Sequence, residues 1–142
     1  MTRRMQLASV ALMAGTTLGL AGLTAGADKE KAATIKEVMQ KINGKGNKTA
    51  SAKLKAALKA ETPDWTAIQE ATKVYAELTP ALGENEPPRG SAESWKKLSG
   101  QFAETSKALD DAAQSKDLEA VKAASKKIGG YCMPCHTAHK KQ

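Results

Sequence analysis

The chain is poor in large apolar side chains. Its 142 residues include two tryptophans, two tyrosines and one phenylalanine, and aromatic residues make up only 4% of the total. Alanine dominates the apolar positions after residue 27, and an alanine gains little free energy from burial. A domain of this size buries only about two-thirds of its unfolded surface. These shortages indicate that something besides side chains fills part of the interior.

The chain also lacks β-branched runs and strand-like alternation after residue 27. Apolar residues instead recur at helical spacing, in "TIKEVMQKIN" and, after the interruption "GKGNK", in "SAKLKAALKA". The same spacing continues further along at Trp65, Ile68, Tyr75, Leu78 and Leu82, at Trp95, Leu98, Phe102 and Leu109, and at Leu118, Val121, Ile128, Cys132, Cys135 and His139. Four amphipathic stretches predict an all-α, antiparallel up-down four-helix bundle.

Local signals place two of the helix starts. In "TPDW", Thr62 is a candidate cap and Pro63 a candidate first-turn residue. Pro87 and Pro88 in "GENEPPRG" predict a linker, after which Ser91 begins the next helix. All of these segments fit into a single domain over residues 28–142.

The N-terminal segment has the three-part pattern of a secretory signal. Arg3 and Arg4 precede an uncharged stretch that starts at Leu7, and Ala25-Gly26-Ala27 matches a cleavage site. The alternative is a permanent membrane anchor, which the glycines and threonines of this stretch disfavour. We therefore expect a cleaved signal over residues 1–27, export to the periplasm, and no stable membrane insertion afterwards.

The net charge of +7 comes mostly from lysines that are spread along the chain. Because they form no basic arm and few aromatics accompany them, nucleic acid is not an expected partner. Docking of acidic protein partners fits better, although a solvated helical face is the default explanation for such lysines.

Both histidines and both cysteines of the chain lie between Cys132 and His139, in "CMPCHTAH". Cys132, Cys135 and His136 form Cys-x-x-Cys-His, the attachment motif of a c-type haem. Two thiols one helical turn apart can add to the two vinyl groups of a haem, and the next histidine can then bind the iron. The motif predicts one covalently attached haem c, which is consistent with an exported protein.

Three other uses of the cluster compete with haem. Cys132 and Cys135 could close a short disulfide within a purely structural bundle. A thioredoxin-like redox pair would require strands that this chain lacks. A zinc site could recruit His136 and His139 as well, but four ligands within eight helical residues cannot easily surround a tetrahedral ion.

A second iron ligand has to come from upstream of the motif. Cleavage removes Met1, Met5 and Met13, and Met133 is held between the two cysteines. Met39 remains, on the apolar stripe of the first helix, and methionine–histidine ligation raises the reduction potential of a haem. The alternatives are that Met39 only packs, which leaves a five-coordinate iron open to small gases, or that a lysine replaces it.

The motif in "YCMPCHTAHK", the Pro-Pro loop and Met39 together resemble the class II cytochromes c, the cytochrome c-prime superfamily with its low-spin, methionine-ligated branch. The resemblance implies that Cys132 and Cys135 form the thioethers, that His136 is the proximal ligand and that Met39 is the sixth ligand. Members of this family often dimerise through their first two helices, so a homodimer stays open. Lys140 or Lys141 would replace the arginine that often lies near a propionate in the family.

The residues and the resemblance lead to one leading hypothesis. It is an exported monohaem c-type cytochrome, without enzymatic turnover, that carries single electrons between redox protein partners. The alternative is a high-spin, cytochrome c-prime-like protein that binds nitric oxide or carbon monoxide. The role of His139 stays open between a propionate contact, a helix cap and a solvent-facing side chain.

Overall fold

The computed structural model describes residues 31–141. The predicted signal segment, residues 1–27, lies outside this range. The elements are α1 (Ile35–Asn43), α2 (Ala50–Lys59), α3 (Trp65–Leu78), the 3-10 helix η1 (Thr79–Leu82), α4 (Ala92–Gln114) and α5 (Leu118–His139). No helix within the described residues is long and apolar enough to cross a membrane.

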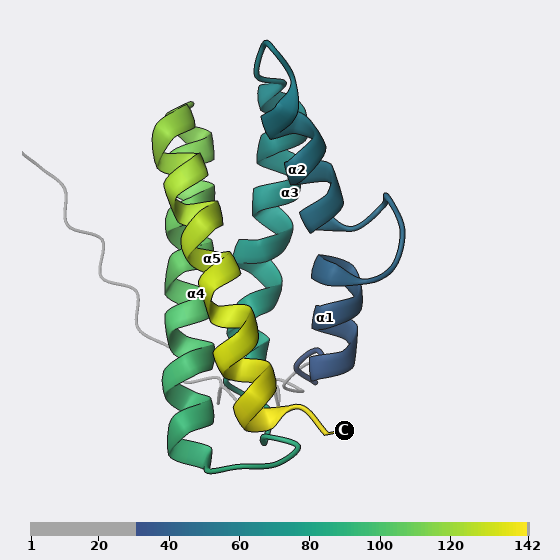
Figure 1. Cartoon of the computed structure of the whole chain (residues 1–142), viewed down its shortest axis with the longest axis vertical. Coiled ribbons are helices and arrows are strands. Elements are labelled where there is room, and N and C mark those ends of the chain that lie inside the picture. The colour runs from purple at the N-terminus through teal and green to yellow at the C-terminus, as the bar shows by residue number, and fades with distance from the viewer. Residues whose placement is uncertain (1–30, 142) are drawn as a thin grey trace, which may run out of the picture.

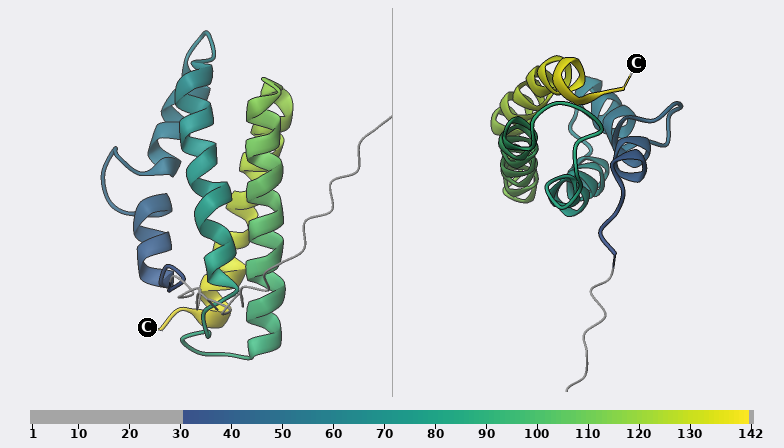
Figure 2. Two further views of the ribbon diagram at one scale, coloured as in Figure 1. Left: turned by 180° about the vertical axis from the view of Figure 1, so that it is seen from behind. Right: turned by 90° about the horizontal axis from the view of Figure 1, so that it is seen from below.

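The helices form the antiparallel four-helix bundle that the sequence predicts (Figure 1). The consecutive helices α1 and α2 together make the first arm, and α3, α4 and α5 make the other three. The two views of Figure 2 show the arms alternating in direction and packed around a common axis. In both Figures 1 and 2, α1 and the C-terminal part of α5 lie at the same end of the bundle.

Side-chain caps define where the helices begin. Ser91 caps α4, as predicted, by accepting a hydrogen bond from the amide of Ser94. The prediction for α3 was wrong, because Asp64 rather than Thr62 is its cap and Pro63 precedes the cap. The Asp64 carboxylate accepts the amide of Ala67 at 3.0 Å, so the anionic residue takes the position next to the helix N-terminus.

The interruption in the first arm is real. Helix α1 has a capping box, in which the Thr34 hydroxyl accepts the amide of Glu37 and the Glu37 carboxylate accepts the amide of Thr34. The helix ends at Asn43, and α2 begins only after Thr49, which caps it. A loop over 44–49 therefore separates the two helices.

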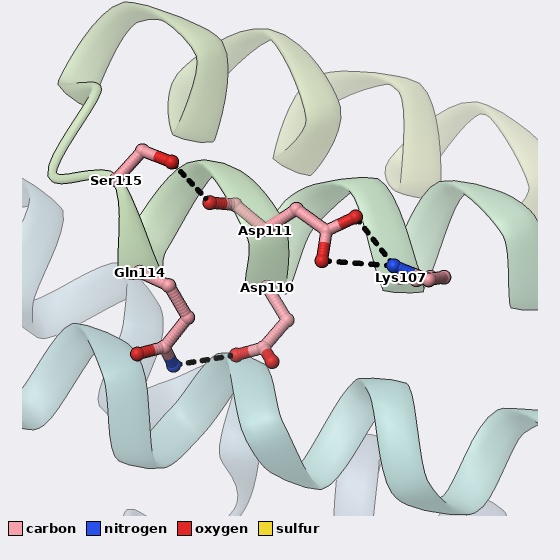
Figure 3. A network of polar contacts seen from close by, with 5 residues as sticks. All are labelled: Lys107, Asp110, Asp111, Gln114 and Ser115. Atoms are coloured by element: carbon pink, nitrogen blue, oxygen red, sulfur yellow. Dashed lines mark hydrogen bonds and ion pairs between the residues drawn. The ribbon is translucent and has the colours of Figure 1, made fainter. Parts of the chain in front are cut away.

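The core is built from medium-sized side chains and runs along all four arms. Its fully buried members include Val38, Ile42, Ile68, Leu109 and Val121. Polar bonds reinforce the end remote from α1, where Thr72 donates to Asp110 and Gln69 donates to the carbonyl of Ala113. Figure 3 shows the adjacent surface of α4, where Lys107 pairs with Asp111 and Ser115 donates to the Asp111 carbonyl. This end is closed by direct contacts between side chains.

Candidate haem site

The opposite end of the bundle contains a cavity of about 990 Å³ between α1, η1, α4 and α5. Such a volume lies at the upper end of the range for pockets that hold small molecules and cofactors. Its lining is largely apolar and includes Ile35, Leu82, Pro88, Leu98, Phe102 and Ile128. The bundle therefore has an apolar cavity at one end, in agreement with the shortage of large side chains.

The wall from α5 carries the Cys-x-x-Cys-His motif. Cys132, Cys135 and His136 all line the cavity; Cys135 is half-buried and the other two are exposed. Pro134 lacks an N–H to donate, yet α5 continues through it to His139. The face of α5 that carries these residues thus borders a cavity and does not pack into the core.

The thiols of Cys132 and Cys135 are free and are not joined in a disulfide. Burial raises the pKa of the Cys135 thiol above its ordinary value of 9.0, and the neighbouring Cys132 raises it further. Within residues 31–141, no group of three or more His, Cys, Asp and Glu side chains is arranged to hold a metal ion. This arrangement gives no support to the disulfide and zinc alternatives.

Met39 contributes to the same cavity from α1. It is half-buried, and the neighbouring Val38 and Ile42 are completely buried against the bundle. Asn43, one helical turn after Met39, also lines the cavity and was not singled out by the sequence. The structure thus brings the methionine of the first arm and the histidine of the last arm to one space, although they are far apart in the chain.

His139 is the one residue of the cluster that is fully buried, with 1% of its surface exposed. Its Nδ1 donates to the carbonyl of Arg89 at 2.8 Å, and its Nε2 lies 3.1 Å from the Ser94 hydroxyl. The ring packs edge-on against Trp95, with 5.3 Å between centroids. His139 is therefore a structural connection between α5, α4 and the loop before α4, and of the three roles that the sequence left open its burial excludes the solvent-facing one.

Positive charge borders the cavity. Lys36, Lys140 and Lys141 are all exposed and line it. Arg89 lies nearby, but its guanidinium donates to the carbonyl of Thr137 at the end of α5. The ammonium groups of these lysines can therefore pair with an anionic group of a bound molecule.

These residues fit a c-type haem. The apolar volume suits a tetrapyrrole, two free thiols one helical turn apart suit its vinyl groups, and the imidazole of His136 and the thioether of Met39 are ligands that haem iron accepts. Lysines at the border suit the propionates. The fit rests on the chemistry of the side chains that share the cavity.

Comparison with known proteins supports the same assignment for residues 90–140. Searches of curated proteins and of solved structures gave no match. Residues 90–140, which contain the whole of α4 and of α5, match the family model described as Cytochrome C'. Over this segment, which includes the Cys-x-x-Cys-His motif, the chain is similar to the cytochrome c' family, the class II cytochromes c.

Proposed function

We propose that this protein is an exported, periplasmic monohaem cytochrome that carries single electrons and has no enzymatic turnover. Cys132 and Cys135 would hold the haem through thioether bonds, and His136 and Met39 would bind its iron. The observation that carries the proposal is that Met39 of α1 and the motif of α5 line one apolar cavity. A c-type haem bound there supplies a one-electron ferric/ferrous couple.

The chain's own residues favour electron transfer over turnover. Apolar side chains surround most of the cavity, and an apolar surrounding limits the access of solvent to a bound haem. The nearby His139 is engaged at both ring nitrogens, by Arg89 and Ser94, and so does not serve as a free catalytic base. Lys36, Lys140 and Lys141 at the border offer an acidic redox protein a complementary surface.

One observation favours a second function. Helix α1 is only nine residues long and is separated from α2 by a loop, so Met39 is carried on a small element. A five-coordinate iron that binds nitric oxide or carbon monoxide is therefore the second candidate.

The test is an absorption spectrum of holoprotein made with a functional haem-attachment system. Methionine ligation predicts low-spin bands with a weak methionine-to-ferric-iron charge-transfer band. The Met39→Ala variant should then become high-spin and bind carbon monoxide more readily, with a lower potential. The matched control is Met133→Ala, whose side chain is 71% exposed, and it should keep the wild-type spectrum. A wild-type spectrum that Met39→Ala leaves unchanged would remove Met39 from the site.

A further inference from the structure

The position of α1 is not fixed by its covalent connections. A helix of nine residues has little stability of its own. It leads into the loop 44–49, where Gly46 has a φ of 100°. Burial of Val38 and Ile42 attaches α1 to the bundle, but hydrophobic contact is non-directional. A directional contact is needed to fix how far along its axis α1 sits, and hence where Met39 lies.

Asn85 supplies such a contact. Its side-chain amide nitrogen donates to the carbonyl of Ala33 at 2.9 Å and to the carbonyl of Ala81 at 2.6 Å. Ala33 precedes the helix cap Thr34, so its carbonyl lies outside the helical hydrogen-bond pattern. Met39 follows less than two turns later. The half-buried Asn85 therefore holds the N-terminal end of the helix that carries Met39.

The backbone around Asn85 is itself anchored to α4. The indole N–H of Trp95 donates to the carbonyl of Asn85 at 2.8 Å and to the carbonyl of Leu82 at 3.0 Å. Trp95 is buried and packs edge-on against His139 of α5. Helix α4 thus holds the main chain of Asn85, and the side chain of Asn85 holds the start of α1.

The same loop is attached to α5 a few residues later. The Arg89 carbonyl accepts from His139, and the Arg89 guanidinium donates to the carbonyl of Thr137. Thr137 directly follows His136, the candidate proximal ligand. Both bonds join segments about fifty residues apart in the chain. The loop therefore contacts the last turns of α5 with one part and the start of α1 with another.

We propose that the loop over residues 83–90 is a brace that sets the position of Met39 relative to His136, and that Asn85 is the positioning residue for Met39. The sequence reads this segment as a linker, but its hydrogen bonds connect the two elements that carry the candidate ligands. The proposal rests on the proposed haem ligation, and its test separates the two.

The test uses two variants of the holoprotein. Asn85→Ala removes both side-chain bonds, and Asn85→Asp keeps the volume but replaces the donor nitrogen with an acceptor that faces two carbonyls. Imidazole is then mixed with the ferric protein, where it can replace methionine only after Met39 has dissociated. We expect the limiting rate of imidazole binding to rise about tenfold in Asn85→Ala and further in Asn85→Asp, which is the effect of losing one or two hydrogen bonds.

Amide hydrogen exchange gives a second readout. Exchange across Ile35–Asn43 should rise by a similar factor, while exchange in the middle of α4 should not. The matched control is Gln69→Ala, which also removes a side-chain amide that donates to a distant carbonyl, that of Ala113, but at the other end of the bundle. It should lower overall stability and leave both α1 exchange and the imidazole rate unchanged.

The outcomes distinguish the brace from the ligation. If the wild-type spectrum lacks a methionine–iron band, the ligation by Met39 is wrong, and unchanged α1 exchange in both Asn85 variants would overturn the brace as well. If the band is present, the brace is overturned when the imidazole rate of both Asn85 variants stays at the wild-type value. It is also overturned when Gln69→Ala raises that rate equally, since the effect would then be general loss of stability.

Discussion

The Nδ1 of His139 lies 2.8 Å from the carbonyl oxygen of Arg89, fifty positions earlier in the chain. Since a carbonyl only accepts, Nδ1 donates this hydrogen bond, and the Nε2 on the other side of the ring lies 3.1 Å from the hydroxyl of Ser94. A completely buried polar ring is thus satisfied on both sides. This side chain joins the end of α5 to α4 and to the loop before α4, and it lines the cavity.

Replacing His139 with alanine should therefore destabilise the protein strongly. The change removes a buried ring and leaves the Arg89 carbonyl without its partner, and together these effects cost about 2–4 kcal/mol. Urea unfolding of the holoprotein measures the loss. Lys127→Ala, at an exposed position of α5, is the control and should change the free energy of unfolding by less than about 0.5 kcal/mol. Equal stability of the two variants would contradict the structural role of His139.

Gly90 lies against the same ring, and we expect Gly90→Ala to be destabilising. Its φ is 80°, and an added Cβ would lie 2.8 Å from the Ala138 carbonyl oxygen and 2.9 Å from the His139 Nδ1. Backbone strain alone costs about 1 kcal/mol or more, and the two close contacts add to it. Thermal unfolding compares this variant with Gly46→Ala, where φ is 100° but nothing lies within 4 Å. The Gly90 variant should be clearly the less stable of the two.

The sequence predicts the bundle because the bundle depends on local information. Helical spacing identifies the apolar faces, and glycines and prolines mark the breaks, including the one after Asn43. The cap of α3 was misassigned because Thr62 and Asp64 are both good caps within three residues. The choice between them depends on the path of the chain after α2, and local helix propensity carries no information about that path.

The candidate site is predicted in part for a similar reason. Cys-x-x-Cys-His is contiguous, so the sequence alone identifies it. Met39 is the candidate second ligand because the other methionines are either in the predicted signal or held between the two cysteines. His139 falls on the inward stripe of the last helix, but its partners Arg89 and Ser94 are long-range and carry no local signal. The same holds for Asn85, whose bond to Ala33 spans 52 positions.

Cys135 should react more slowly than Cys132 in the apoprotein. The thiolate is the reactive form, and burial together with the neighbouring Cys132 raises the pKa of Cys135. Cys135 is also half-buried, whereas Cys132 is exposed. Brief treatment with iodoacetamide at pH 8, followed by peptide mass spectrometry, should find the label mainly on Cys132. In urea the difference should disappear, and equal labelling without urea would contradict the described burial.

The start of α1 should weaken in acid. The hydrogen bond from the backbone amide of Thr34, and then that from its hydroxyl, lower the pKa of Glu37 below its ordinary value of 4.5. A carboxylate whose pKa is lower in the folded state stabilises that state above its unfolded pKa, and the contribution is lost as the pH falls through the folded value. Exchange of the α1 amides should therefore increase below about pH 4.5. Glu37→Gln keeps a capping-box residue that does not titrate, so its α1 should show a flatter pH dependence. Identical acid profiles for Glu37→Gln and the wild type would mean that another group controls the change.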